Sequence, residues 1–156
     1  MWWRRLRYVL LLIALCSIAT CPTAKRSCQA RNRAQEAEDL LQYLADRVAA
    51  QATSTGKVPA LAAGPTPTPD CCEQGGVCAA DPTRWATPGW QALGFSIDDD
   101  HRFTYEYVPD PSGRSAIVRA VGDLDCDDDT SLYEVEIKID AGGALRRKWT
   151  RKKPYE

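Results

Sequence analysis

The residues with the clearest chemical potential are acidic and lie in one short stretch of the chain. Carboxylates occupy positions 1, 3, 5, 7 and 12 of the calcium-loop pattern D-x-D-x-D-G-x5-E. They are Asp123, Asp125, Asp127, Asp129 and Glu134. Ca²⁺ takes six to eight oxygen ligands, and this spacing brings alternate carboxylates toward one centre. We therefore predict calcium as the cofactor, ordering the loop. The alternative is a solvated acidic connection, because Asp128 stands where the pattern has glycine.

Four cysteines form a second group that could do chemistry: Cys71, Cys72, Cys78 and Cys126. Four thiolates can hold zinc, but the spacing lacks the paired C-x-x-C units of structural zinc sites. Disulfides are the expected chemistry in an exported chain. Adjacent cysteines rarely bridge each other, so Cys71 and Cys72 should pair separately with Cys78 and Cys126, in either order. We predict two structural disulfides, one of which pins the Pro-rich region to a sheet.

The sequence gives little support to catalysis. His101 is the single histidine, and it follows three aspartates, which is typical of a solvated turn. Ser96 and Ser112 stand in no nucleophile-elbow motif. No glycine-rich phosphate loop precedes a helical pattern. We therefore predict that the protein is not an enzyme and has no catalytic residues.

The N-terminal residues 1–21 predict export. A cationic opening is followed by the apolar run Val9 to Thr20, which is shorter than the roughly 20 residues that cross a bilayer. That length is typical of a signal peptide. Two alternatives remain, a lipobox with Cys21 as the lipidated residue, and a retained membrane anchor. All three predict that the rest of the chain lies outside the cytoplasm. It is then secreted, periplasmic or membrane-anchored. An uncleaved or lipidated N-terminus would provide the membrane contact.

The charges are segregated although the formal net charge is only −1. Acidic residues dominate from Asp98 to Asp140, and residues 146–153 are almost purely basic. Such asymmetry bears on partners and solubility rather than on fold. We interpret the basic stretch as a solvated strand end and predict no nucleic-acid partner.

Residues 22–52 contain an amphipathic helix. Apolar residues recur at three- and four-residue steps, at Ala34, Ala37, Leu41, Leu44 and Val48. We expect this stripe to face the core, with a partner-facing helix as the alternative.

Residues 53–92 are rich in proline, glycine and cysteine, and we interpret them as connecting loops. From residue 93 to 156 the period changes to two, which predicts antiparallel strands. The resulting fold class is α+β, with the helix packed on a four-stranded antiparallel sheet and residues 22–156 forming one domain.

Several segments together resemble the type IV pilin and pseudopilin family, most of all pilin-like proteins of the deltaproteobacterial type. They are Cys71-Cys72 with Cys78, Trp90 to Phe95, Phe103 to Tyr107, and Ala120 to Asp127. The resemblance implies an N-terminal helix on a four-stranded antiparallel sheet, and envelope or pilin-like proteins as partners.

The N-terminus departs from the family pattern. A prepilin has a Gly-Phe cleavage junction and a glutamate inside a long apolar helix, and neither occurs here. We interpret the chain as a pilin-like head domain on a different export signal. The expected function is a non-catalytic structural or protein-interaction role in the envelope, accessory to a type IV pilus or type II secretion assembly. The alternative is a stand-alone secreted or lipid-anchored calcium-binding module.

Overall fold

The computed structural model describes residues 31–155. The predicted signal segment 1–21, with the candidate lipidation residue Cys21, lies outside the described residues. Residues 33–156 form one compact unit. Helix α1 covers residues 31–55 of the described chain. It is followed by β1 (Ala63–Thr66), the short 3-10 helix η1 (Pro82–Trp85), α2 (Pro88–Leu93), β2 (Thr104–Pro109), β3 (Ser115–Gly122), β4 (Ser131–Ile139) and β5 (Leu145–Lys152).

The sheet has five strands in the order β1-β2-β3-β4-β5, and every neighbouring pair is antiparallel. The predicted four-stranded sheet is therefore wrong, although the α+β class is compatible with the structure. The additional strand, β1, comes from the Pro-rich segment that the sequence predicted to be a loop. β1 lies at the edge of the sheet, where a proline such as Pro65 is tolerated because no second neighbour needs its missing N–H.

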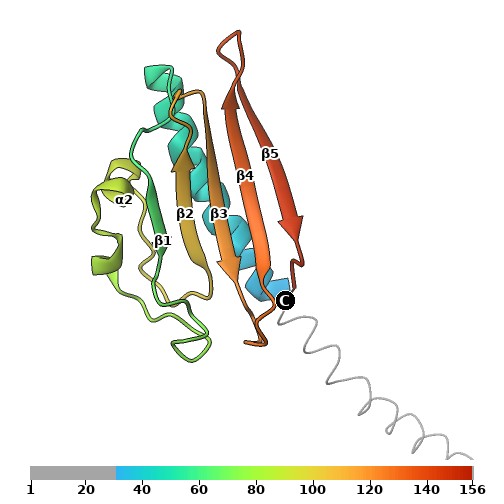
Figure 1. The fold of residues 1–156 in the computed structure, drawn as a ribbon. Coiled ribbons are helices and arrows are strands. Elements are labelled where there is room, and N and C mark those ends of the chain that lie inside the picture. The colour runs from blue at the N-terminus through green and yellow to red at the C-terminus, as the bar shows by residue number, and fades with distance from the viewer. Residues whose placement is uncertain (1–30, 156) are drawn as a thin grey trace, which may run out of the picture. The chain divides into compact units, whose positions relative to one another are not determined.

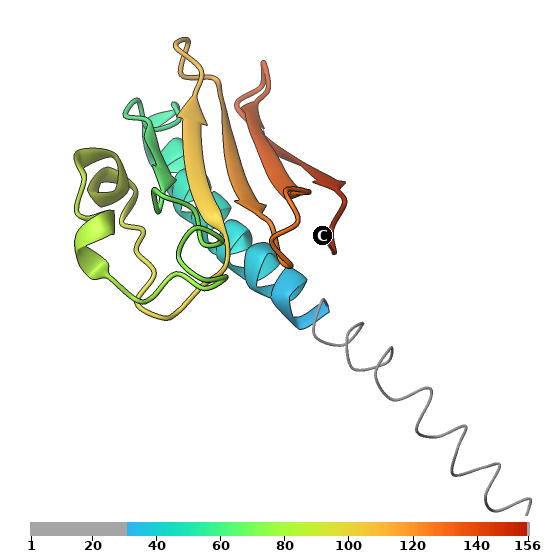
Figure 2. The same cartoon turned by 60° about the horizontal axis from the view of Figure 1, so that its bottom comes forward.

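Helix α1 lies against one face of this sheet (Figures 1 and 2). The inward side chains of β2, β3 and β4 are fully buried, among them Tyr105, Val118 and Val135. The predicted helical stripe faces them, and Leu41 and Leu44 are both 0% exposed. Burying a leucine side chain completely is worth roughly 2 kcal/mol, so this contact is a main source of stability. The stripe is core-facing, as expected.

Two ion pairs join helix α1 to β5, the strand at the opposite edge of the sheet from β1. Arg147 pairs with Asp46 at 2.5 Å, and Arg151 pairs with Glu38 at 2.7 Å. The hydrogen bond that Arg151 donates to the Glu38 carboxylate raises the pKa of Arg151. These two contacts occupy part of the basic stretch that the sequence indicated would be solvated.

An aromatic cluster fills the space beside β1 and β2. Trp85, Trp90 and Phe95 have ring centroids 5.2–5.4 Å apart. Trp90 donates its indole N–H to the Thr66 hydroxyl at 2.8 Å, which ties α2 to β1. The short helices η1 and α2, with the turns around them, therefore pack against the sheet and are not free loops.

Candidate functional site

Two disulfides hold the segment between β1 and η1. Cys71 bonds to Cys78, and Cys72 bonds to Cys126 in the loop between β3 and β4. The prediction that these four cysteines form two disulfides is confirmed, and the open question of their pairing is answered. Cys72–Cys126 spans 54 residues of chain, and closing such a loop stabilises the folded state by about 4 kcal/mol in the chain-entropy model. Disulfides of this kind indicate an oxidising, extracytoplasmic environment.

Asp123 organises the acidic loop between β3 and β4. Its carboxylate accepts backbone N–H groups from Cys126 at 2.6 Å, Asp127 at 3.3 Å and Asp128 at 2.9 Å. Asp128 has a φ of 73°. That left-handed conformation is what glycine would supply in the calcium-loop pattern, and aspartate is one of the few other residues that adopts it readily.

The structure brings together three of the five predicted calcium ligands. One carboxylate oxygen each from Asp123, Asp125 and Asp127 lie within 4.8 Å of one another. Asp129 instead forms an ion pair with Lys153. Glu134 lies in β4, where its carboxylate accepts the Arg119 Nε–H at 2.7 Å. Calcium binding by this group stays a prediction.

The mutual repulsion of the three carboxylates would favour a bound cation. The pKa of Asp125 is raised by desolvation first, and then by repulsion from Asp127 and Asp123. A bound cation would remove that repulsion and lower the pKa. The loop geometry itself is held by the hydrogen bonds to Asp123.

A cleft of about 320 Å³ lies between the disulfide-held segment and the outward face of β2 and β3. Its lining combines apolar surface with four charged side chains, those of Asp70, Arg102, Glu106 and Asp123. Arg102 is anchored to helix α1, because its backbone N–H and its guanidinium both donate to Glu36, at 2.7 and 3.3 Å. This cleft and the adjoining acidic loop form what we call the loop face, made of residues 70–78, the cleft lining and residues 123–130.

The prediction that His101 is a solvated turn histidine is wrong. The residue is 1% exposed, and its ring centroid lies 5.8 Å from that of Trp85 and 6.4 Å from that of Tyr105. Its backbone exchanges two hydrogen bonds with Cys78, at 2.8 and 3.0 Å, which turns the side chain inward. A signal was available in the sequence, since His101 continues the two-residue period of the inward residues Phe103, Tyr105 and Tyr107.

The two serines considered as nucleophiles belong to local turns. The Ser96 hydroxyl donates to Asp98 at 3.2 Å, and the Ser112 hydroxyl donates to Asp110. The Ser112 hydroxyl, followed by its backbone N–H, lowers the pKa of Asp110. Both contacts have the form of turns that hold the backbone, and the absence of catalysis stays a prediction.

No family model matches the chain, and no curated protein or solved structure shows significant similarity to it. Within residues 31–155, no helix combines the length and the apolar character that crossing a membrane requires.

Proposed function

We propose that this protein is a non-catalytic, pilin-like or pseudopilin-like component of the cell envelope with a structural or protein-interaction role. It acts as an accessory to a type IV pilus or type II secretion assembly. The chain is delivered by its N-terminal segment and is secreted, periplasmic or membrane-anchored. The mass of the mature chain, isolated from its own envelope, distinguishes a cleaved N-terminus from a lipidated Cys21 and from a retained anchor.

The observation that carries this proposal is the Cys72–Cys126 bridge across a helix-and-sheet domain. The bridge joins the segment that precedes the antiparallel strands β2 to β5 to the β3–β4 loop. The segments that carry the pilin resemblance surround this bridge or fill the core beside it, and Trp90 and Phe103 are both 0% exposed. Stapled loops on a rigid sheet suit a surface that must present a fixed shape to another protein.

The loop face is the surface that we assign to this role. It is held by both disulfides and by the Asp123 hydrogen bonds, so a partner would meet it with little ordering cost. The stripe of Leu41 and Leu44 is excluded as a partner surface, because both side chains are fully buried under the sheet.

Site-specific photocrosslinking in the native envelope tests the proposal. A photoreactive amino acid is placed at Glu73 or Asp128, both exposed on the loop face. The control position is Ala141, exposed in the β4–β5 turn. That turn lies at the opposite end of β4, roughly 30 Å away for a nine-residue strand.

We expect crosslinks to a pilus or type II secretion component from Glu73 and Asp128 but not from Ala141. Crosslinks of equal yield from all three positions, or crosslinks solely to proteins outside those assemblies, would refute the proposal. Melting curves of each variant establish that the domain is folded.

A stand-alone calcium-binding module is the second candidate function. It is favoured by the convergence of Asp123, Asp125 and Asp127 together with the left-handed backbone of Asp128. A melting temperature that rises with calcium, in a chain that crosslinks to no envelope assembly, would favour this candidate over the first.

A further inference from the structure

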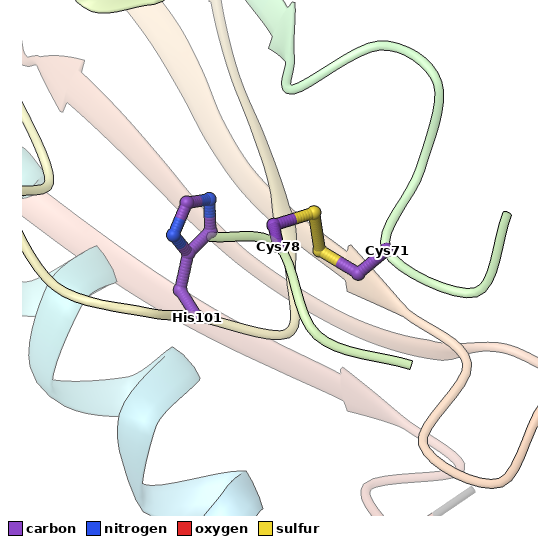
Figure 3. A group of neighbouring side chains, drawn as sticks. All are labelled: Cys71, Cys78 and His101. Atoms are coloured by element: carbon purple, nitrogen blue, oxygen red, sulfur yellow. A yellow bond between two sulfur atoms is a disulfide. The ribbon is translucent and has the colours of Figure 1, made fainter. Parts of the chain in front are cut away.

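Three metal-ligand side chains meet beneath the loop face, where the proposed function uses Cys71 and Cys78 only as a structural disulfide. A ring nitrogen of His101 and the sulfur atoms of Cys71 and Cys78 lie within 4.8 Å of one another. Figure 3 shows the imidazole ring beside the disulfide. All three residues are at least 97% buried, with exposures of 3% for Cys71, 0% for Cys78 and 1% for His101. Two sulfurs and an imidazole are the donor set that zinc selects.

The hydrogen bonding of His101 is compatible with metal ligation. Its Nδ1 lies 3.1 Å from the backbone carbonyl oxygen of Asp99. An Nδ1–H that donates to this carbonyl leaves the lone pair on Nε2, which is the tautomer that ligating histidines usually hold. Nε2 is buried and has no hydrogen-bond partner among the described residues. A buried ring nitrogen without a partner is costly, so this atom calls for an explanation.

We propose that the Cys71–Cys78 pair, when reduced, binds a zinc ion together with His101. A dithiol reductant gives two electrons and two protons to the disulfide, which yields two cysteine thiols and the oxidised, cyclic disulfide of the reductant. Zn²⁺ then binds both sulfurs and Nε2, and the two thiol protons are released to solvent. The product carries no net charge, because two thiolates balance the ion and the imidazole is neutral. Neutrality matters because a net charge at this depth would be strongly disfavoured.

The ligands stay in place when the disulfide opens, because other contacts hold them. Cys78 and His101 are joined by their two backbone hydrogen bonds, and Cys71 accepts backbone N–H groups from Gln74 at 3.2 Å and Gly76 at 2.7 Å. The sulfurs must separate to about 3.8 Å, which follows from tetrahedral angles and a Zn–S distance of about 2.3 Å. Side-chain rotation supplies that change. The segment is thus cross-linked in either redox state, by a disulfide or by a metal, and the fourth zinc position remains for water.

A second group of possible ligands must be removed before the experiment. The sulfur atoms of Cys72 and Cys126 and a carboxylate oxygen of Asp123 also lie within 4.8 Å of one another. The parent for the test is the full chain with Cys72→Ser and Cys126→Ser. It is refolded with a phosphine reductant, and Co²⁺ and Zn²⁺ are the probes. Cobalt reports thiolate ligation through its sulfur-to-metal charge-transfer band, and competition with a chelator gives the zinc affinity.

We expect the reduced parent to bind a metal ion with thiolate bands, and the oxidised parent to show no thiolate bands. His101→Gln keeps a polar side chain of similar size, and it should weaken zinc affinity by more than about tenfold. Cys78→Ser should remove most of the charge-transfer band. Equal affinity in the parent and His101→Gln, or the same affinity in the oxidised chain, would overturn the proposal, as would the absence of thiolate bands in a folded, reduced parent.

Loss of folding in the parent does not end the test. The reduced chain with all cysteines present is then compared with its own His101→Gln variant, because the Cys72 group is common to both. The readout is the zinc-induced rise in melting temperature. A rise that is the same in both chains contradicts the assignment, and a smaller rise in the variant supports it.

Discussion

At the scale of single residues, Asp123 and Asp125 have opposite roles in the same loop. Asp123 holds three backbone N–H groups and so fixes the turn. Asp125 is repelled by its acidic neighbours, and this repulsion adds to desolvation in raising its pKa. The chain tolerates this repulsion because the loop is exposed and solvent screens the charges.

Asp125→Asn therefore separates calcium binding from loop structure. In the calcium-free chain the substitution should change stability by less than about 0.5 kcal/mol, because the residue is on the surface. With calcium present, the wild-type chain should melt at a higher temperature, by the equivalent of about 2.7 kcal/mol at a hundredfold excess over Kd. The variant should lose most of that gain. Calorimetry with calcium and with magnesium makes the comparison, and a wild-type melting temperature that ignores calcium would remove the calcium prediction.

The buried tyrosines predict a loss of stability in alkali. Burial, with smaller effects of nearby charges, raises the pKa of Tyr133 to about 12. Burial also raises the pKa values of Tyr105 and Tyr107. An unfolded tyrosine titrates at about 10, so the folded state holds protons that the unfolded state loses. The contribution of these tyrosines to stability is therefore fully present below about pH 10, and it is lost as the pH rises through about 12.

Tyr133→Phe provides the check on that sign. The variant loses the hydrogen bond from the hydroxyl to the Pro154 carbonyl, which should cost about 1 kcal/mol near neutral pH. Its stability should then fall less steeply between about pH 10 and 11 than that of the wild type, by up to about 1.4 kcal/mol per pH unit. Urea unfolding at each pH measures both slopes. Parallel slopes would show that Tyr133 does not hold its proton on folding.

At the scale of elements, the edge strand β1 depends on one glycine. Gly64 has a φ of 83°, and a Cβ atom there would lie 2.4 Å from the backbone oxygen of Tyr105 in β2. Only a residue without a side chain lets the two strands approach this closely. The Pro-rich connection thereby becomes a strand, and it closes over the Trp90 ring.

Gly64→Ala tests this dependence, and Gly143→Ala is its matched control. Gly143 has the same φ of 83°, but nothing lies within 4 Å of a Cβ atom placed there. Both substitutions carry the backbone cost of about 1 kcal/mol. Gly64→Ala should cost at least about 1 kcal/mol more, because β1 must move away from β2. Hydrogen exchange of the Tyr105 and Tyr107 amides would localise the loss, and equal unfolding free energies for the two variants would contradict it.

At the scale of the whole molecule, the elements with a strong hydrophobic period could be predicted from the sequence. The elements that depend on tertiary contacts could not. The helical stripe and the alternation in β2, β3 and β4 are local patterns, and they could be read directly. β1 could not be predicted because its pairing partner begins about 40 residues later and its prolines are typical of loops. Among the site residues, the cysteine set was predictable but its pairing was not. The calcium pattern assumed that Glu134 follows the loop, whereas Glu134 lies on the sheet beside Arg119.

The two disulfides should contribute unequally to the stability of the whole chain. In the chain-entropy model the stabilisation grows with the number of residues enclosed, so Cys72–Cys126 is worth about 4 kcal/mol and Cys71–Cys78 about 2.5 kcal/mol. Replacing Cys72 and Cys126 by serine should therefore lower the unfolding free energy more than replacing Cys71 and Cys78. Urea unfolding under oxidising conditions measures both losses. The Cys71–Cys78 pair is the more severe test of the chain-entropy model. Its serine replacements would also place two hydroxyl groups in the core, which adds to the loss of stability. A larger loss for Cys71 and Cys78 would mean that packing around His101 outweighs loop closure.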